Sequence, residues 1–365
     1  MLHLKLTGLS ALGQSVWFDY IQRSLIENGQ LQSLIDQGIK GVTSNPSIFE
    51  KAIAESTDYD LALKNMLADS PLSQQKYEKL VLSDIAAAAD LFRPVFDQSK
   101  GLDGYVSLEV NPHLANQTSG TVDEALRLYE ILDRPNIMIK VPATPEGIPA
   151  VKTLISMGVN INTTLMFNLK HYGEVVEAYI SGLEERLREG YKINSIASVA
   201  SFFISRVDSI ADQKLLELRR EDLQGKTAIA NAKLVYRQFQ KLFSGPRWEK
   251  LSQAGAKVQR PLWASTGTKN PEFSDTLYMD TLIGENTVNT VPPATLEAFL
   301  DHGSIRQSVT EDYQGAQEHI KKLESMNIDL NELTDQLQLD GVAAFQKAYD
   351  QLLQAIEQKI TLMKD

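Results

Sequence analysis

Eight short apolar runs rich in Val, Ile and Thr recur along the 365-residue chain, and most are followed by a stretch compatible with a helix. This alternation is typical of βα units built around a parallel sheet. The expected strands are residues 16–19, 40–45, 105–110, 137–142, 159–165, 195–203, 261–266 and 286–292. Eight such units predict an α/β fold, a closed (β/α)₈ or TIM barrel, although an open doubly wound sheet has the same rhythm.

Three parts of the chain are expected to add helices to this barrel. Residues 46–104 contain about three helical patterns, and residues 204–260 contain a charged helix followed by another at 230–243. C-terminal helices are expected over about 307–365, and residues 341–365 would pack on the outside of the barrel through one apolar face. That face comprises Val342, Phe345, Tyr349, Leu352, Leu353, Ile356 and Ile360. Because no linker or tandem repeat divides the chain, residues 1–365 are interpreted as a single domain.

Charge and composition limit the partners of the chain. The formal net charge is −11, which predicts no general attraction to nucleic acid or to anionic membranes. No stretch approaches the twenty apolar residues of a membrane span, and the first twenty residues lack the apolar core of a secretory signal. Cysteine is absent, which fits a reducing compartment. We expect a soluble cytoplasmic protein, and the sequence does not distinguish a monomer from a homodimer.

Polar side chains lie at or near the ends of the expected strands. Lys140 is near the end of NIMIKVPAT (136–144), Glu109 lies in SLEVNP (107–112), and Asp19 ends the first run. Further polar residues at such positions are Asn45, Asn162, Thr164 and Ser201. In a barrel the carboxyl ends of the strands converge on one mouth, where the catalytic groups of this fold sit. One lysine and two carboxylates would therefore face a common cavity.

Lys140 is the most informative of these residues, because charged side chains are rarely buried unless they are paired or chemically used. A lysine that points into water is the alternative for this string alone. An apolar strand end penalises the ammonium form, and only the unprotonated amine attacks a carbonyl. Together with Glu109 and Asp19, Lys140 suits Schiff-base chemistry, in which one carboxylate moves protons during imine formation. The second would take the proton of the hydroxyl beside the breaking carbon–carbon bond.

Metal-dependent chemistry is disfavoured by the histidine pattern. The five histidines are far apart in the sequence and form no HxH or HExxH pair that would suggest zinc. We therefore expect no metal site.

Six segments, taken in order and spacing, resemble the transaldolase family of the longer bacterial type: VTSNPSIFEKAI, VSLEVNP, IMIKVPATPEGIPAV, NINTTLMFN, SFFISRVD and TVNTVPPATLEAF. The resemblance covers roughly residues 15–365 and implies a (β/α)₈ barrel without metal or organic cofactor. It also implies reversible transfer of a dihydroxyacetone unit in the non-oxidative pentose phosphate pathway. The donor would be sedoheptulose 7-phosphate or fructose 6-phosphate, and the acceptor glyceraldehyde 3-phosphate or erythrose 4-phosphate.

Two alternatives remain beside this activity. One is an enzyme similar to the fructose 6-phosphate aldolases, which would release free dihydroxyacetone; the shorter chains of that group argue against it. The other is a non-catalytic barrel that binds sugar phosphates. Such a barrel would be expected to have lost Lys140, Glu109 or Asp19, and all three are present.

Position by position, the resemblance implies a Schiff base on Lys140, imine formation through Glu109 and a bound water, and proton transfer at the cleaved bond by Asp19. It implies substrate contacts from Asn45, Asn162, Thr164, Ser201 and Phe203, and it implies that Asn162 and Thr164 also position the catalytic water. Core packing is an equal alternative for Phe203, and Asn45 followed by Pro46 is also an ordinary helix start.

The resemblance further implies a phosphate site. Arg206 matches the phosphate-binding arginine of the family, and a guanidinium can grip phosphate oxygens through two hydrogen bonds. Lys269 would hold a second phosphate position, at which other members carry arginine, and Ser265 would add a hydroxyl; a solvated loop is the alternative for both. Thr163 departs from the family pattern NLTL, and strand alternation points it away from the site.

Overall fold

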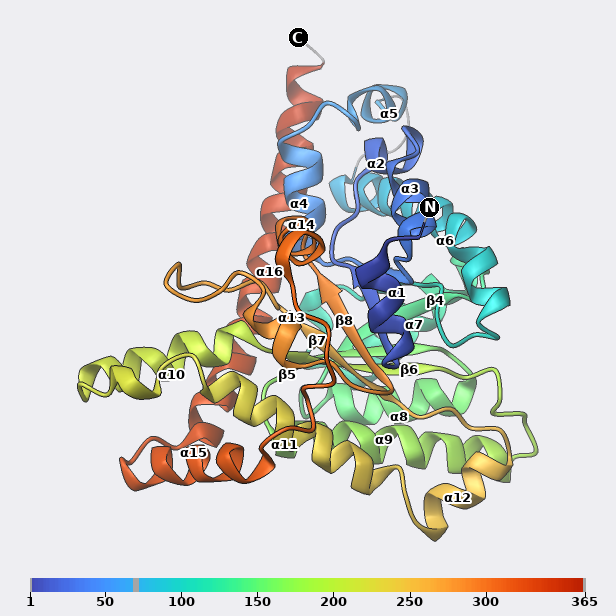
Figure 1. Cartoon of the computed structure of the whole chain (residues 1–365). Coiled ribbons are helices and arrows are strands. Elements are labelled where there is room, and N and C mark those ends of the chain that lie inside the picture. Colours follow the sequence, from blue (N-terminus) through green and yellow to red (C-terminus); the bar gives the residue numbers. More distant parts are fainter. Residues whose placement is uncertain (1, 68–71, 364–365) are drawn as a thin grey trace.

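The computed structural model describes residues 2–67 and 72–363, and its eight parallel strands form a closed barrel in the order β1 to β8 (Figure 1). Strand β8 pairs with β1, so the closed barrel is confirmed and the open doubly wound sheet is wrong. The strands are β1 (Gln14–Phe18), β2 (Gly41–Thr43), β3 (Tyr105–Glu109), β4 (Ile137–Pro142), β5 (Ile161–Met166), β6 (Ser198–Phe203), β7 (Arg260–Ala264) and β8 (Thr287–Val291).

The strand ends differ from expectation by a few residues, for local reasons. Strand β2 ends at Thr43 because Asn45 already caps the next helix, its side chain accepting a hydrogen bond from the backbone N–H of Ile48. Strand β7 ends at Ala264 because Ser265 adopts a left-handed backbone conformation with φ of 56°.

Helices surround the barrel and extend from it. The amino-terminal half contains α1 (Leu4–Ala11), α2 (Arg23–Glu27), α3 (Gln30–Gln37), α4 (Pro46–Ala54), α5 (Asp60–Asn65), α6 (Ser73–Gln98), α7 (Thr118–Leu132) and α8 (Gly147–Met157). The remainder contains α9 (Leu169–Arg188), α10 (Ser205–Glu217), α11 (Thr227–Leu242), α12 (Pro246–Gln253), α13 (Leu277–Thr281), α14 (Pro293–His302), α15 (Tyr313–Ser325) and α16 (Leu330–Leu362). Short 3₁₀ turns occur at Pro112–Leu114 and Glu221–Leu223. Helices therefore occur in all three parts of the chain where additional ones were expected.

The C-terminal helix α16 differs from expectation in both length and position. It begins at Leu330, where the side chain of Asp329 accepts hydrogen bonds from the first turn. Figure 1 shows α16, in red, running beside α4, and the two helices pack closely together. Gln338 donates hydrogen bonds to two backbone carbonyls, that of Ala143, directly after β4, and that of Leu165, within β5. The helix thus packs through most of the expected apolar face and, in addition, reaches the carboxyl-end mouth.

The amino-terminal end of the barrel is held by a buried ion pair. Arg260 lies 3.0 Å from Asp103, and both side chains are at most 7% exposed. Ser15 and Trp17 donate hydrogen bonds to the same carboxylate. The pair neutralises two buried charges at this end of the barrel. This fits a structural role, because the catalytic groups of this fold lie at the opposite end. Within the described residues, no helix combines the length and the apolarity that crossing a membrane requires.

Candidate active site

A cavity of about 190 Å³ opens at the carboxyl ends of the strands. All of the expected site residues except Glu109 and Asn162 line it. The lining comprises Asp19, Thr43, Asn45, Ser47, Lys140, Thr164, Ser201, Phe203, Arg206, Ala264, Ser265, Gly267, Lys269, Thr290, Pro292 and Phe345. The wall is therefore mainly polar, with positive and negative side chains in one enclosure.

Strand register aligns the central residues of the site. Glu109 of β3 pairs with Lys140 of β4, and Lys140 pairs with Asn162 of β5. Directly paired residues of neighbouring strands point to the same side of a sheet. The three side chains therefore form one row inside the barrel.

Lys140 is buried within the barrel, with its side chain only 6% exposed. Its Nζ donates a hydrogen bond to the backbone carbonyl of Ser44 at 2.9 Å and lies 3.5 Å from Oε2 of Glu109. The alternative of a lysine that points into water is therefore wrong. Its amine faces the same cavity as Asp19.

Glu109 lies between Lys140 and a second, much smaller cavity. Burial raises the pKa of its carboxyl, which the charge of Lys140 opposes and that of Asp19 reinforces. Among the described residues its Oε2 atom has no hydrogen-bond partner. The small cavity, of about 30 Å³, is lined by Glu109 together with Tyr77 and Tyr349 among other residues, and it is large enough for a water molecule.

Asp19 lies directly after β1 and accepts a hydrogen bond from the Thr43 hydroxyl at 2.6 Å. Burial raises the pKa of Asp19, and the Thr43 hydrogen bond and Lys140 partly oppose this. The Thr43 hydroxyl also contacts that of Thr290. Both threonines line the cavity and were not among the expected site residues, although each lies at or near the end of a strand.

Asn162 faces its neighbours rather than the cavity. Its side-chain oxygen accepts a hydrogen bond from Ser201 at 2.6 Å, and its amide nitrogen donates to Ser107 at 3.1 Å. Ser201 and Thr164 do line the cavity, whereas Thr163 does not. Strand β5 is irregular here, since its pairing with β6 shifts between Thr163 and Met166.

The positive side chains gather around the start of α10. Arg206 lies 5.1 Å from the centre of the Phe203 ring, and burial lowers its pKa. Within residues 2–67 and 72–363, neither Arg206 nor Lys269 makes an ion pair or a side-chain hydrogen bond to another group. Ser265 contacts the hydroxyl of Ser205 at 2.9 Å. The partly buried Arg206 and the exposed Lys269 thus both line one cavity, which suits an anionic group.

Two more lining residues were not expected from the sequence. Ser47 lies in the first turn of α4, two residues after the Asn45 cap, and Pro46 between them occupies the first helical position. Phe345 comes from α16 and was interpreted only as part of a packing face. Asn45 combines both of its expected features, since it caps α4 and lines the cavity.

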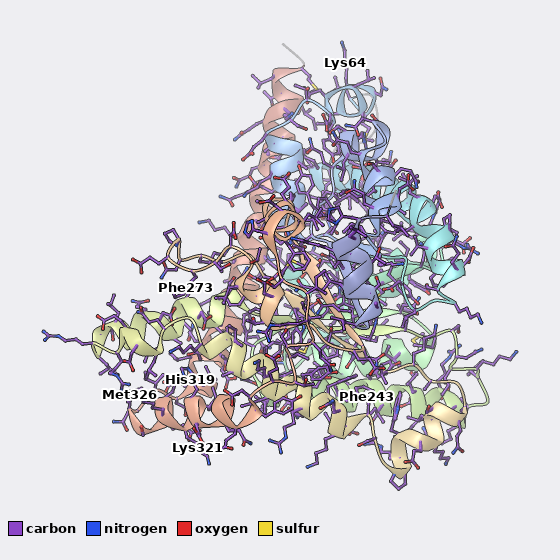
Figure 2. All side chains as sticks on the ribbon, in the orientation of Figure 1. Lys64, Phe243, Phe273, His319, Lys321 and Met326 are labelled. Atoms are coloured by element: carbon purple, nitrogen blue, oxygen red, sulfur yellow. The ribbon has the colours of Figure 1, made fainter. Side chains whose placement is uncertain are left out.

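The described residues contain no cluster of side chains that could bind a metal ion. No group of three or more His, Asp or Glu side chains among the described residues could hold a metal ion. His319, labelled in Figure 2, lies on α15 and contacts the hydroxyl of Thr227.

Comparison with known proteins agrees with this geometry. The model of the transaldolase/fructose-6-phosphate aldolase family matches residues 16–356. A transaldolase of Trichodesmium erythraeum is 45% identical, with 97% of both sequences covered. Transaldolase 2 of a Nostoc species is 43% identical over 98% of both chains, and a transaldolase of Thermobifida fusca is 44% identical over 97% of this chain and 98% of its own. The resemblance seen in the sequence is confirmed, and the chain belongs to the transaldolase/fructose-6-phosphate aldolase family.

Proposed function

We propose that this chain is a transaldolase that transfers a dihydroxyacetone unit through a Schiff base on Lys140. The donor is sedoheptulose 7-phosphate or fructose 6-phosphate, and the acceptor is glyceraldehyde 3-phosphate or erythrose 4-phosphate. One observation carries the proposal above the others: a buried lysine amine lies beside Glu109 and faces the same cavity as Asp19. Close relatives that bear the name transaldolase support the same activity.

Imine formation uses Lys140 and Glu109. The amine adds to the C2 carbonyl of the ketose, and the resulting carbinolamine loses its hydroxyl as water after accepting a proton. Glu109 supplies that proton through a water molecule, for which the adjacent small cavity has room. The raised pKa of Glu109 keeps the proton available at a higher pH than an ordinary carboxyl would.

Carbon–carbon cleavage uses Asp19. Its carboxylate removes the proton of the C4 hydroxyl, the C3–C4 bond breaks, and the bonding electrons move toward the iminium nitrogen to give an enamine. An aldose phosphate leaves. In the second half, the enamine carbon attacks the acceptor aldehyde, Asp19 returns its proton to the new alkoxide, and hydrolysis of the imine frees the product and the Lys140 amine. The Thr43 hydroxyl stabilises the ionised form of Asp19.

Substrate binding follows the polarity of the cavity. Asn45, Thr164 and Ser201 offer hydrogen bonds to sugar hydroxyls, and Phe203 forms part of the wall. Asn162 holds Ser201 in place through their short hydrogen bond. The phosphate binds Arg206, with Lys269 and Ser265 as further contacts.

A transfer assay tests this function. The protein is incubated with fructose 6-phosphate and erythrose 4-phosphate, and sedoheptulose 7-phosphate, glyceraldehyde 3-phosphate and free dihydroxyacetone are measured. Equal amounts of the two phosphate products are expected, with little free dihydroxyacetone. Free dihydroxyacetone as the main product, even with excess acceptor, would support the fructose 6-phosphate aldolase alternative. No product of either kind would support a binding protein without activity.

A further inference from the structure

Phe345 places an aromatic ring in the wall of the cavity that contains Lys140. It belongs to the C-terminal helix α16, and the residue as a whole is only 4% exposed. Most of the other lining side chains are hydroxyl, amide or charged groups, so Phe345 and Phe203 are the only large apolar side chains in the wall that the described residues form. Phe345 therefore contributes a water-repelling surface to a polar enclosure.

Contacts with the carboxyl ends of neighbouring strands fix the position of α16. Besides the bonds of Gln338 to the ends of β4 and β5, Gly341 lies very close to the barrel. A Cβ atom at Gly341 would lie 2.9 Å from Leu165 and 3.6 Å from the Arg206 guanidinium. A larger residue there would push into the helix–barrel contact, one helical turn before Phe345. The ring is therefore held in place by the packing of its own helix.

The same helix reaches the second cavity. Tyr349, one turn after Phe345, lines the small cavity beside Glu109, and its ring packs edge-on against Tyr77 at 5.5 Å. One face of α16 thus contributes Phe345 to the wall of the substrate cavity and, one turn later, Tyr349 to the wall of the water-sized cavity.

Competition with water arises from the proposed function, on which this inference rests. After the first aldose leaves, the enamine on Lys140 must persist until an acceptor aldehyde binds. If the enamine takes a proton on its carbon instead, it becomes an iminium that water attacks at C2. The carbinolamine then expels the Lys140 amine and leaves free dihydroxyacetone. Exclusion of water from a reactive intermediate is a recognised function of closed active sites.

We propose that Phe345 is a specificity-determining residue that keeps water from the Schiff-base intermediate and so favours transfer over release of dihydroxyacetone. The reaction type of the site would thus depend on a residue from the C-terminal helix as well as on the barrel. Substitution of the ring should change the partition between two products and leave the formation of the Schiff base largely intact.

The test compares Phe345→Ala with wild type and with Leu352→Ala. Leu352 is fully buried on the same helix but does not line the cavity, so its substitution loosens α16 without opening the wall. Fructose 6-phosphate is supplied with a fixed concentration of erythrose 4-phosphate, and free dihydroxyacetone is measured relative to sedoheptulose 7-phosphate. In Phe345→Ala this ratio is expected to rise on the order of tenfold, and in Leu352→Ala to stay near the wild-type ratio.

Further measurements keep the outcomes distinct. Borohydride trapping with fructose 6-phosphate reports the Schiff base separately, and circular dichroism reports folding. A folded Phe345→Ala that traps the adduct but keeps the wild-type ratio would overturn the inference, as would an equal rise in Leu352→Ala. If Phe345→Ala does not fold, Phe345→Leu takes its place in the same comparison. Its ratio of free dihydroxyacetone to sedoheptulose 7-phosphate is expected to rise by about threefold. Failure of wild type itself to form an adduct would instead reject the proposed function.

Discussion

The Nζ atom of Lys140 lies 3.5 Å from Oε2 of Glu109, and both side chains are at most 6% exposed. Removal of both charges from water is costly, so the pair is not explained by stability alone. Burial also raises the pKa of Glu109, which favours a carboxyl group that can give up a proton to a leaving hydroxyl. The pair thus joins a nucleophile and a proton donor at one point of the barrel mouth.

Glu109→Gln is expected to slow imine formation by about 10²- to 10⁴-fold, because glutamine cannot supply the proton that the carbinolamine needs. Single-turnover trapping of the adduct with borohydride at a series of times measures this rate. Glu130→Gln, which neutralises an exposed carboxylate on α7, is the control and should leave the rate unchanged. Imine formation at the wild-type rate in Glu109→Gln would remove Glu109 from the mechanism.

The pH dependence of carbon–carbon cleavage should respond to Thr43. Asp19 acts as a base only when ionised, so activity falls as the pH drops through its raised pKa. Since the Thr43 hydrogen bond lowers that pKa, Thr43→Val is expected to raise it further and to move the acid limb of the kcat/KM profile to higher pH. Thr43→Ser keeps a hydroxyl and should stay near wild type. An acid limb that stays in place in Thr43→Val would show that Asp19 does not set it.

Arg206→Gln tests the phosphate site. Loss of a charged hydrogen-bond donor to the phosphate is expected to lower kcat/KM for fructose 6-phosphate by about 10- to 100-fold, corresponding to roughly 1.5–3 kcal/mol. Activity toward unphosphorylated fructose should change little. Arg188→Gln, at the exposed end of α9, provides a control of equal charge change. An equal loss of kcat/KM for fructose 6-phosphate and for fructose would mean that Arg206 supports the barrel and does not bind the phosphate.

Asp208 should make stability depend on pH. It is buried, accepts hydrogen bonds from the backbone of Ala228 and from Tyr278, and burial raises its pKa from 3.8 to about 6. Between these values the folded chain keeps a proton that the unfolded chain has lost, so the contribution of Asp208 to the free energy of unfolding falls as the pH rises. The fall amounts to about 3 kcal/mol and is complete above about pH 6.

Asp208→Asn removes this titration and preserves the shape of the side chain. The free energy of unfolding of Asp208→Asn relative to wild type should therefore increase by about 2 kcal/mol between about pH 4 and pH 7. Urea denaturation at both pH values measures it. Asp123→Asn, at an exposed position, should show no such trend. A difference that is independent of pH would contradict the raised pKa of Asp208.

The barrel and much of the site could be predicted because they depend on local patterns. Lys140 and Glu109 lie at the ends of consecutive strands, and the geometry of a parallel barrel brings such ends together. The contact of Phe345 with the cavity could not be predicted, since it depends on where a helix from the end of the chain lies over the mouth. Asn162 was expected to face substrate, but its hydrogen bonds to two serines depend on strand register that periodicity does not fix.

Covalent trapping shows whether Lys140 is the residue that forms the Schiff base. The protein is treated with borohydride in the presence of fructose 6-phosphate, digested and analysed by peptide mass spectrometry. A stable three-carbon adduct is expected on the peptide that contains Lys140, and Lys140→Met should abolish it. A protein that turns over fructose 6-phosphate without any adduct on Lys140, or an adduct that persists in Lys140→Met on another lysine, would contradict this expectation.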